Sequence, residues 1–303
     1  MDDLLRCVLD ARPPATDSLA AWWAATTAIR APFDAPVDRA IVGGAWADRL
    51  GFAFAGGYQA ALQTLVPEHG GIGALCVTEA KGNAPKHIET VLVPAGDHFE
   101  LTGTKKWATA APLATHLLVA ATTGTDDEGR NRIRLVRVAT DAPGVTLAPS
   151  SAPFVPEIPH AQVTLVKVSV READVLPGDG YSEYIKPFRT IEDAHVQAAL
   201  LGYLIGVARR HSFVRELVEQ LAAAAIAVRG IALADPKSPM THFALAGAIT
   251  QIGKLVGELE RAWEAVSDDE HLRWKRDRPL LNVAQAARNT RRENAWARLS
   301  SKA

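Results

Sequence analysis

The chain has 303 residues, 48% of them apolar, and its 33 basic and 34 acidic side chains leave a formal charge of -1. It is long enough to bury a substantial core in one to three domains. The charge is balanced, without a basic stripe, which argues against nucleic acid as a partner. The 9 histidines lack metal-ligand spacing and the two cysteines, Cys7 and Cys76, lie far apart, so no metal site is predicted and a reducing cytoplasm is the default setting.

Two stretches bear on membranes and secretion. The first residues, Met-Asp-Asp-Leu-Leu-Arg, lack the basic start and apolar core of a signal peptide. The longest uncharged apolar run, residues 50–66, is shorter than a membrane span and predicts a buried helix. We therefore expect a protein without a membrane-spanning segment.

Residues 1–74 predict a short N-terminal helical region. Helical segments begin near Asp17 and Asp38, each after a stretch that contains proline. Tryptophans in this region are expected to fill a core or an interface. Small residues would let helices approach closely, and they occur as two pairs, Gly43–Gly44 and Gly56–Gly57.

Residues 75–186 predict the strands of an antiparallel barrel or sandwich. Two apolar runs flank the turn Pro-Ala-Gly-Asp at residues 94–97, which predicts a hairpin. In these two runs Val91, Val93, Phe99 and Leu101 fall on alternating positions, which supports the hairpin. Further along, residues 132–138 alternate Arg with Ile, Leu and Val, a pattern typical of a strand with one wet face.

Residues 187–303 predict a C-terminal helical bundle. Thr190 has the character of an N-cap, with Glu192 and Asp193 as acids in the first turn. The helix continues through residues 196–210. Further helices are expected over residues 214–233, 241–266 and 279–299.

The order Thr78-Glu79, a hairpin, Gly103-Thr-Lys-Lys-Trp107 and then Thr109 resembles the middle domain of the acyl-CoA dehydrogenases. In that family the run reads Thr-Glu-Pro, a Gly/Ser loop, and Gly-x-Lys-x-Trp-Ile-Thr-Asn. The resemblance covers residues 50 to about 266. It implies an α+β, acyl-CoA dehydrogenase-like fold with a short N-terminal helical region, a middle antiparallel β-barrel, and a C-terminal helical bundle that is truncated relative to the family.

The resemblance also implies a function and a cofactor. Family members remove an α-proton from an acyl-CoA thioester while a β-hydride passes to FAD. This chain is accordingly expected to act on an acyl-CoA or other acyl thioester as a homodimer or homotetramer. Thr78, Trp107 and Thr109 match the residues that line the flavin ring. Each is also ordinary in a strand, so their combined order carries the hypothesis.

Two departures from the family pattern are visible. The loop after Glu79 reads Ala-Lys-Gly-Asn-Ala-Pro instead of Pro-Gly-Ala-Gly-Ser-Asp, so Ala84 replaces the serine that touches the substrate's cofactor tail. The chain stops before the loop in which most members carry the catalytic Glu. Segments Arg-Thr-Phe-Gly-Lys and Gln-x-x-Gly-Gly, with which a neighbouring subunit holds the flavin's adenosine half, have no match either.

Some members place the catalytic base on the first C-terminal helix, where this chain offers Glu192, Asp193 and His195. A carboxylate beside an apolar pocket would have a raised pKa and could abstract a proton. The competing interpretation is that Glu192 and Asp193 complement the helix dipole. Two other functions stay open: a degenerate, non-catalytic member acting as a partner subunit or acyl-binding protein, and a flavin-dependent monooxygenase.

Overall fold

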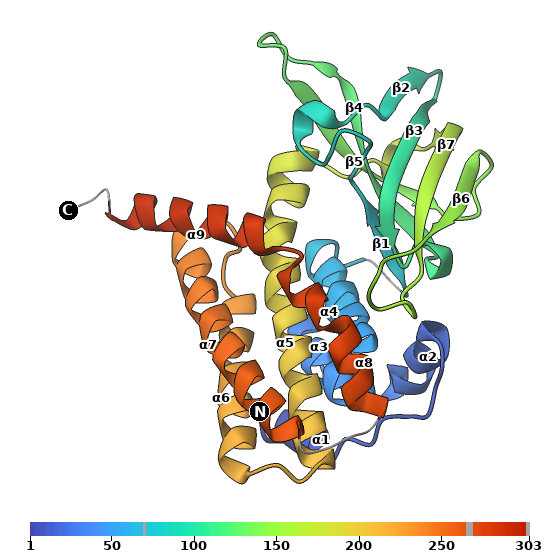
Figure 1. Ribbon diagram of the computed structural model, residues 1–303. Coiled ribbons are helices and arrows are strands. Elements are labelled where there is room, and N and C mark those ends of the chain that lie inside the picture. The colour runs from blue at the N-terminus through green and yellow to red at the C-terminus, as the bar shows by residue number, and fades with distance from the viewer. Residues whose placement is uncertain (69–70, 265–268, 301–303) are drawn as a thin grey trace. The chain divides into compact units, whose positions relative to one another are not determined.

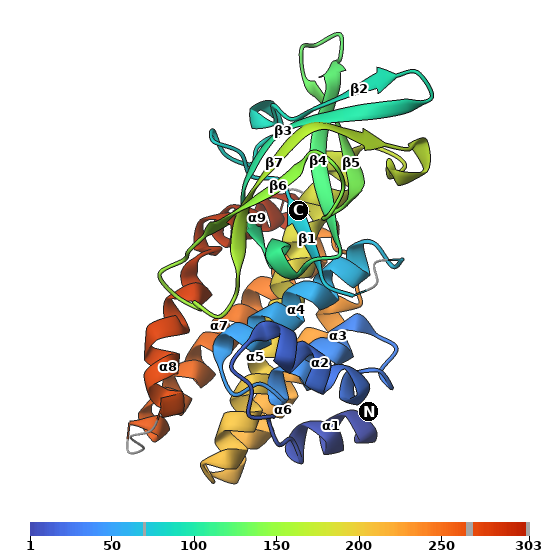
Figure 2. The same ribbon diagram turned by 90° about the vertical axis from the view of Figure 1, so that its right-hand side faces the viewer.

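The helices from both ends of the chain pack into one unit, and the strands form another (Figures 1 and 2). This computed structural model describes residues 1–68, 71–264 and 269–300. The helical unit comprises Met1–Thr64 and Thr190–Ala303, and the sheet unit comprises Leu65–Arg189. The two helical segments, predicted from the sequence as separate regions, share one unit in the structure.

The helical unit is built around one long central helix, α5 (yellow in Figure 1). Nearly every residue between positions 193 and 208 is buried, as expected of a helix that is surrounded on all sides. The helices of the chain are α1 (Asp2–Leu9), α2 (Leu19–Arg30), α3 (Pro36–Ala45), α4 (Leu50–Leu65), α5 (Lys186–Arg210), α6 (Arg215–Ala232), α7 (Pro239–Trp263), α8 (Asp269–Asp277) and α9 (Gln285–Ser300).

Glycines set how closely α3 and α4 approach α5. A Cβ atom on Gly44 would lie 1.9 Å from the carbonyl oxygen of Ala199. On Gly57 it would lie 2.8 Å from the carbonyl oxygen of His195. The predicted close approach is therefore confirmed at these two positions. The α5 side contributes Gly202, where a Cβ would lie 2.0 Å from the carbonyl oxygen of Ile41.

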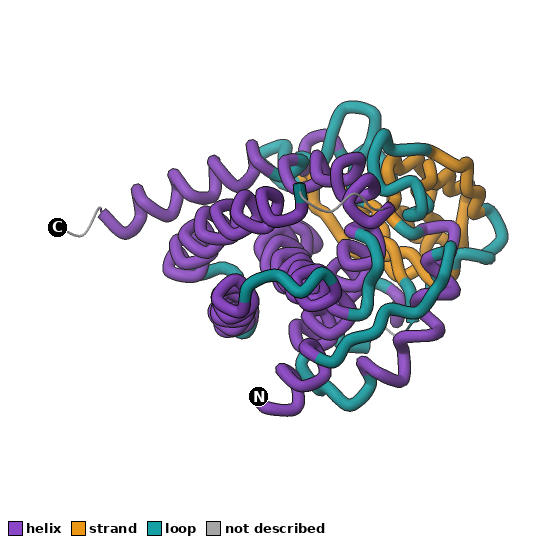
Figure 3. Tube along the Cα trace, turned by 60° about the horizontal axis from the view of Figure 1, so that its bottom comes forward, coloured by secondary structure: helices purple, strands orange, loops and turns teal. Residues whose placement is uncertain are grey.

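The sheet unit holds a single seven-stranded sheet, curled into a half-barrel (orange in Figure 3). Its order is β1-β4-β2-β3-β7-β6, with β5 paired to β4. The predicted acyl-CoA dehydrogenase-like fold is confirmed, and the structure adds that β4 runs parallel to β1 and β2. The strands are β1 (Gly73–Cys76), β2 (Val91–Ala95), β3 (His98–Thr109), β4 (His116–Thr125), β5 (Asn131–Ala139), β6 (Val145–Ser150) and β7 (His160–Val170).

The predicted hairpin is confirmed, and its pairing places Leu92 with Leu101 on one face and Val91 with Val93 on the other. β2 and β3 pair antiparallel around Gly96, whose φ of 73° suits a tight turn. Leu92 pairs with Leu101, and both are buried in the barrel core. Val91 and Val93 pair with Thr102 and Glu100 on the opposite face, where they are 39% and 45% exposed.

The predicted N-cap at Thr190 was also wrong. α5 begins at Lys186 and directly continues a π-helical turn, Gly180–Ile185. The cap lies before that turn, where the Asp179 carboxylate accepts the N–H of Ser182 at 2.7 Å. Local sequence near Thr190 looks like a helix start, but the chain is already helical when it reaches this residue.

The remaining helices follow the predictions with shifted ends. The helix expected over 241–266 begins at Pro239 and runs to Trp263, and residues 265 and 266 lie outside the described residues. The helix expected over 279–299 is divided into a 3₁₀ segment, Arg278–Asn282, and α9.

The described residues include neither a membrane-spanning helix nor a metal-binding group of side chains. None of their helices is long and apolar enough to cross a bilayer. Within the same part of the chain, no group of three or more His, Cys, Asp and Glu side chains is placed to hold a metal ion.

Candidate functional site

Trp107 lies in a β-bulge of β3. The register with β7 shifts between the pairs Lys105–Val163 and Ala108–Ala161, so two β3 residues face one on β7. Trp107 has a φ of 57°, in the left-handed region that bulky residues rarely adopt. Its side chain is nevertheless 56% exposed. A strained, exposed aromatic residue of this kind is typical of a ligand-contact position.

The two predicted threonines flank this bulge along the chain and across the sheet. Thr78 follows β1, and its carbonyl accepts the backbone N–H of Lys106 at 2.7 Å. Thr109 is the last residue of β3, where it pairs with His160. Both threonines are half-buried, and neither hydroxyl has a hydrogen-bond partner among the described residues. The structure thus brings Thr78 beside the Trp107 bulge, with two hydroxyls available to a ligand.

A buried ion pair, which the sequence analysis did not identify, lies at the base of these segments. The Lys105 ammonium is 2.6 Å from the Glu79 carboxylate, and their side chains are 0% and 5% exposed. Glu79 also accepts the Thr90 hydroxyl at 2.8 Å, the Thr90 N–H at 3.1 Å and the Glu89 N–H at 2.8 Å. The signal in the sequence was the motif itself, since Glu79 and Lys105 occupy the two charged positions that the patterns Thr-Glu and Gly-x-Lys-x-Trp specify.

Burial and pairing act on the protonation of this pair in opposite ways. Burial lowers the pKa of Lys105, and the Glu79 carboxylate acts against that shift. Burial by itself would raise the pKa of Glu79, but Lys105 and two backbone N–H groups hold it below its usual range. Both groups are therefore charged at neutral pH.

Gly103, the first residue of the Gly-x-Lys-x-Trp motif, is required by close packing. A Cβ at this position would lie 2.3 Å from the Thr90 hydroxyl oxygen and 2.6 Å from its Cα. Only glycine lets Thr90 come close enough to β3 while it donates to Glu79.

The candidate carboxylates lie on α5, in the helical unit. Because the helix begins at Lys186, Glu192 and Asp193 are in its second turn, beyond the reach of the helix dipole effect expected at a first turn. The dipole interpretation of these two acids was therefore wrong. Adjacent helical residues project about 100° apart, so the two carboxylates face different surroundings.

Asp193 is occupied by two arginines of α9. The Arg288 guanidinium donates to Oδ1 at 2.6 Å and 2.9 Å and to Oδ2 at 3.1 Å. Arg291 donates to Oδ2 as well. The Asp193 side chain is only 4% exposed. Through these two arginines it joins α9 to α5. Glu192 is half-buried one residue earlier.

His195, the third polar residue of this region, is a buried link between α4 and α5. Its Nδ1 lies 2.8 Å from the carbonyl oxygen of Ile191, and its Nε2 lies 2.9 Å from the Thr64 hydroxyl. Burial lowers the pKa of His195 to about 4. A neutral ring donates from Nδ1 to Ile191, and its Nε2 can then accept the single Thr64 hydroxyl proton, for which the carbonyl oxygen of Ala60 competes at 3.1 Å.

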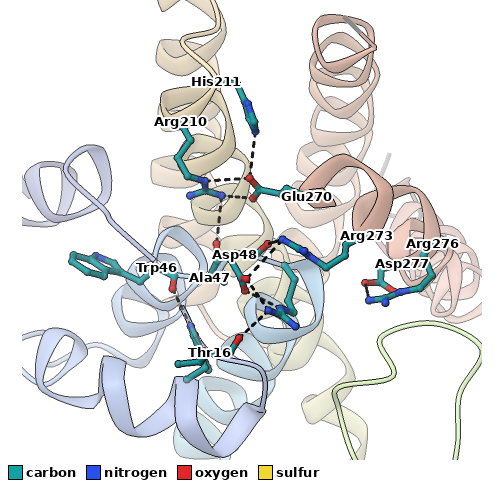
Figure 4. Close-up of polar contacts among 12 residues, drawn as sticks. Thr16, Trp46, Ala47, Asp48, Arg210, His211, Glu270, Arg273, Arg276 and Asp277 are labelled. Atoms are coloured by element: carbon teal, nitrogen blue, oxygen red, sulfur yellow. Dashed lines mark hydrogen bonds and ion pairs between the residues drawn. The ribbon is translucent and has the colours of Figure 1, made fainter. Parts of the chain in front are cut away.

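A separate charged network lies at the other end of α5 (Figure 4). Arg210 pairs with Glu270 of α8 and donates to the carbonyl of Ala47 at 3.5 Å. Arg273 of α8 donates to the carbonyl of Asp48 at 3.4 Å. Arg210 lies about 25 Å along the helix from Asp193, at about 1.5 Å per residue. The network therefore fastens helices together and is remote from the candidate carboxylates.

The half-barrel between helical segments is an acyl-CoA dehydrogenase-like fold. Residues 74–168 match the family model of the acyl-CoA dehydrogenase middle domain. The probable acyl-CoA dehydrogenase YngJ of Bacillus subtilis (strain 168) is 29% identical over 142 residues, which cover 46% of this chain and 36% of YngJ. The predicted resemblance is confirmed: residues 74–168 match the acyl-CoA dehydrogenase middle domain, and the chain has an acyl-CoA dehydrogenase-like fold.

Solved structures of this class are similar over most of the chain. The prolyl acyl carrier protein oxidase AnaB has a TM-score of 0.70 and 15% identity, with 98% of each chain covered. Butyryl-CoA dehydrogenase from Megasphaera elsdenii has a TM-score of 0.66 and 14% identity, covering 86% of this chain and 82% of its own. FkbI, for biosynthesis of a methoxymalonyl extender unit, has a TM-score of 0.65 and 20% identity, with 88% and 84% covered. At these identities the similarity establishes the fold alone.

Proposed function

We propose that this protein is a flavin-dependent oxidoreductase that removes hydrogen from the α and β carbons of an acyl thioester. The observation that carries the proposal is the Trp107 bulge, an exposed indole on a strained backbone, near two threonines whose hydroxyls have no hydrogen-bond partner among the described residues. This arrangement fits a flat, polar-edged ring, because the indole can cover a face while hydroxyls donate to ring atoms. Bound FAD would supply the hydride acceptor.

We propose Glu192 rather than Asp193 as the carboxylate that takes the α-proton. Both oxygens of Asp193 are held by arginines, so accepting a proton there would break several buried charge-assisted bonds. Glu192 lies on the same helix and is partly exposed. Its replacement by Gln should keep flavin binding and remove reduction of the flavin by substrate.

The acyl carrier is proposed to be coenzyme A or a carrier protein. Ala84 stands where the family has a serine that touches the coenzyme A tail, so the usual tail contact is changed. Solved structures with the same fold include both a butyryl-CoA dehydrogenase and an oxidase of a prolyl acyl carrier protein. We propose, from the family resemblance, a cytoplasmic homodimer or homotetramer.

The test is an anaerobic titration of the FAD-loaded protein with a panel of acyl-CoA thioesters and acyl carrier proteins. At least one thioester should bleach the oxidised flavin band, and Glu192→Gln should abolish the bleaching without loss of bound FAD. Asp193→Asn that still bleaches would support the choice of Glu192. Stable yellow flavin with every thioester would contradict the proposed oxidation.

The changed loop and the ion-paired Asp193 favour a second candidate, a non-catalytic family member that acts as a partner subunit or binds an acyl group. It predicts co-purification with a longer homologous chain and no bleaching. A flavin-dependent monooxygenase would use reduced flavin without a catalytic carboxylate. Oxygen uptake driven by a flavin reductase would distinguish it.

A further inference from the structure

The Glu79–Lys105 ion pair lies directly next to both parts of the candidate flavin surface. Glu79 follows Thr78, and Lys105 precedes Trp107 by two residues. We infer that this buried pair is a positioning device that holds the Trp107 bulge against Thr78 in the arrangement a flavin needs. The inference rests on the proposed function for its ligand, and on geometry for the positioning itself.

Burying two charges is costly unless their hydrogen bonds are complete. Glu79 meets this condition, because Lys105, Glu89 and Thr90 together donate four hydrogen bonds to its two oxygens. The Lys105 ammonium has a second acceptor, the carbonyl of Val77, at 3.5 Å. A pair with this many fixed contacts is rigid, and it costs more to break than an exposed pair.

The bulge needs an anchor because the ladder to β7 is interrupted there. Between the Lys105–Val163 and Ala108–Ala161 pairs, the β3 backbone leaves the regular register. Trp107 is held at φ 57° within this interval, and such strain persists only when the surroundings determine it. The described backbone contact across to the Thr78 segment is the 2.7 Å bond from the N–H of Lys106. Lys105, which precedes Lys106, adds a charge-assisted bond to Glu79, which follows Thr78.

The pair also couples the surface to the rest of the half-barrel. Thr90 donates its hydroxyl to Glu79, rests against Gly103, and accepts the N–H of Thr122 from β4 at 2.8 Å. Displacement of the Glu79 carboxylate would therefore disturb the segments around Thr90, Gly103 and Thr122 together. This connection gives a physical reason for the glycine, the lysine and the tryptophan of the motif to occur together.

The experiment measures two quantities in the wild type and in each variant: hydrogen exchange of residues 104–110 in the flavin-free protein, and the affinity for FAD. Lys105→Met and Glu79→Gln remove one charge each. Val136→Ala, in the buried core of β5, controls for general loss of stability, and Arg171→Met removes an exposed ion pair of the same unit. We expect both pair variants to speed exchange in 104–110 and weaken FAD binding roughly tenfold, the factor for one charge-assisted hydrogen bond.

The controls should leave exchange in 104–110 and FAD affinity near their wild-type values. If Val136→Ala produces the same local change, or if folded Lys105→Met and Glu79→Gln leave exchange in 104–110 unchanged, the positioning role is wrong. If Lys105→Met does not fold, Glu79→Gln decides. Absence of FAD binding by the wild type would overturn the proposed function, while the exchange comparison would still test the pair.

Discussion

At the residue scale, Trp107 combines two unfavourable properties. Its backbone is in the left-handed region and its large apolar ring is more than half exposed. Neither property serves packing, whereas both would serve the proposed contact with a planar ligand. The motif drew attention to this residue, but no sequence pattern could predict the bulge, because it depends on the register with β7.

Trp107→Gly should separate stability from ligand binding. Glycine adopts the left-handed conformation without strain, so the free energy of unfolding should change by less than about 1 kcal/mol. FAD affinity should fall about tenfold or more, since an aromatic contact is lost. Urea unfolding and FAD titration measure the two quantities. Lys167→Gly is the matched control, because Lys167 has a φ of 48° and an exposed side chain. An equal loss of FAD affinity in the control would contradict the role of the indole.

His195 should make stability depend on pH. Its pKa is lowered to about 4 by burial, and its ordinary value is 6.5. Between these values the unfolded chain binds the proton and the folded protein does not, so the free energy of unfolding falls as pH decreases from 6.5 to 4. The loss can reach about 3 kcal/mol, at about 1.4 kcal/mol per pH unit.

His195→Gln should reduce this pH dependence, although it lowers stability at pH 7 through the loss of a buried contact. Urea unfolding of both proteins across the acidic range gives the comparison. Equal slopes for the two proteins would show that His195 is not the group responsible.

At the element scale, contacts between residues distant in sequence decided what local patterns could not. Helices, the hairpin and the close glycine packing followed from local composition. The start of α5 was misplaced, because Thr190-Ile-Glu-Asp resembles a capped helix start inside a longer helix. The partners of Asp193 lie 95 and 98 residues away, on a helix whose docking no local pattern encodes.

Asp193 is expected to fix the docking of α9 on α5 (Figure 1). Asp193→Asn would leave two largely buried guanidinium groups without their carboxylate, which costs about 3 kcal/mol or more. Hydrogen exchange should speed up in α9, and flavin reduction should survive in the folded fraction. Glu219→Gln, at an exposed acid of α6, is the control and should leave exchange in α9 unchanged. Loss of flavin reduction with normal protection of α9 would instead identify Asp193 as the base.

The crossing of α3 and α5 should not tolerate even a methyl group. In Gly44→Ala the added Cβ would meet the Ala199 carbonyl at 1.9 Å, so the helices must separate, at a cost of about 2 kcal/mol or more. Gly253→Ala in α7 is the matched control, because a Cβ there meets nothing within 4 Å. It should raise the free energy of unfolding by about 0.5–1 kcal/mol. Thermal and urea unfolding would contradict the packing account if both variants behaved alike.

At the scale of the whole molecule, the sequence predicted the class of fold and the location of the candidate flavin surface in the sheet. The residues beneath that surface were not predicted, because the Glu79–Lys105 pair joins segments 26 residues apart and is recognised only once both are seen to be buried. The chain therefore shares its fold with these solved structures, and in its own sheet unit the buried ion pair lies beneath the candidate flavin surface.

The most direct measurement for the central claim is an equilibrium titration of the purified wild-type protein with FAD, followed by flavin absorbance and fluorescence. If the Trp107 surface binds flavin, FAD binding is saturable and stoichiometric, is weakened by Trp107→Gly and is unaffected by Lys167→Gly. A wild-type protein that leaves free FAD unchanged in both signals would contradict a flavin site in this protein.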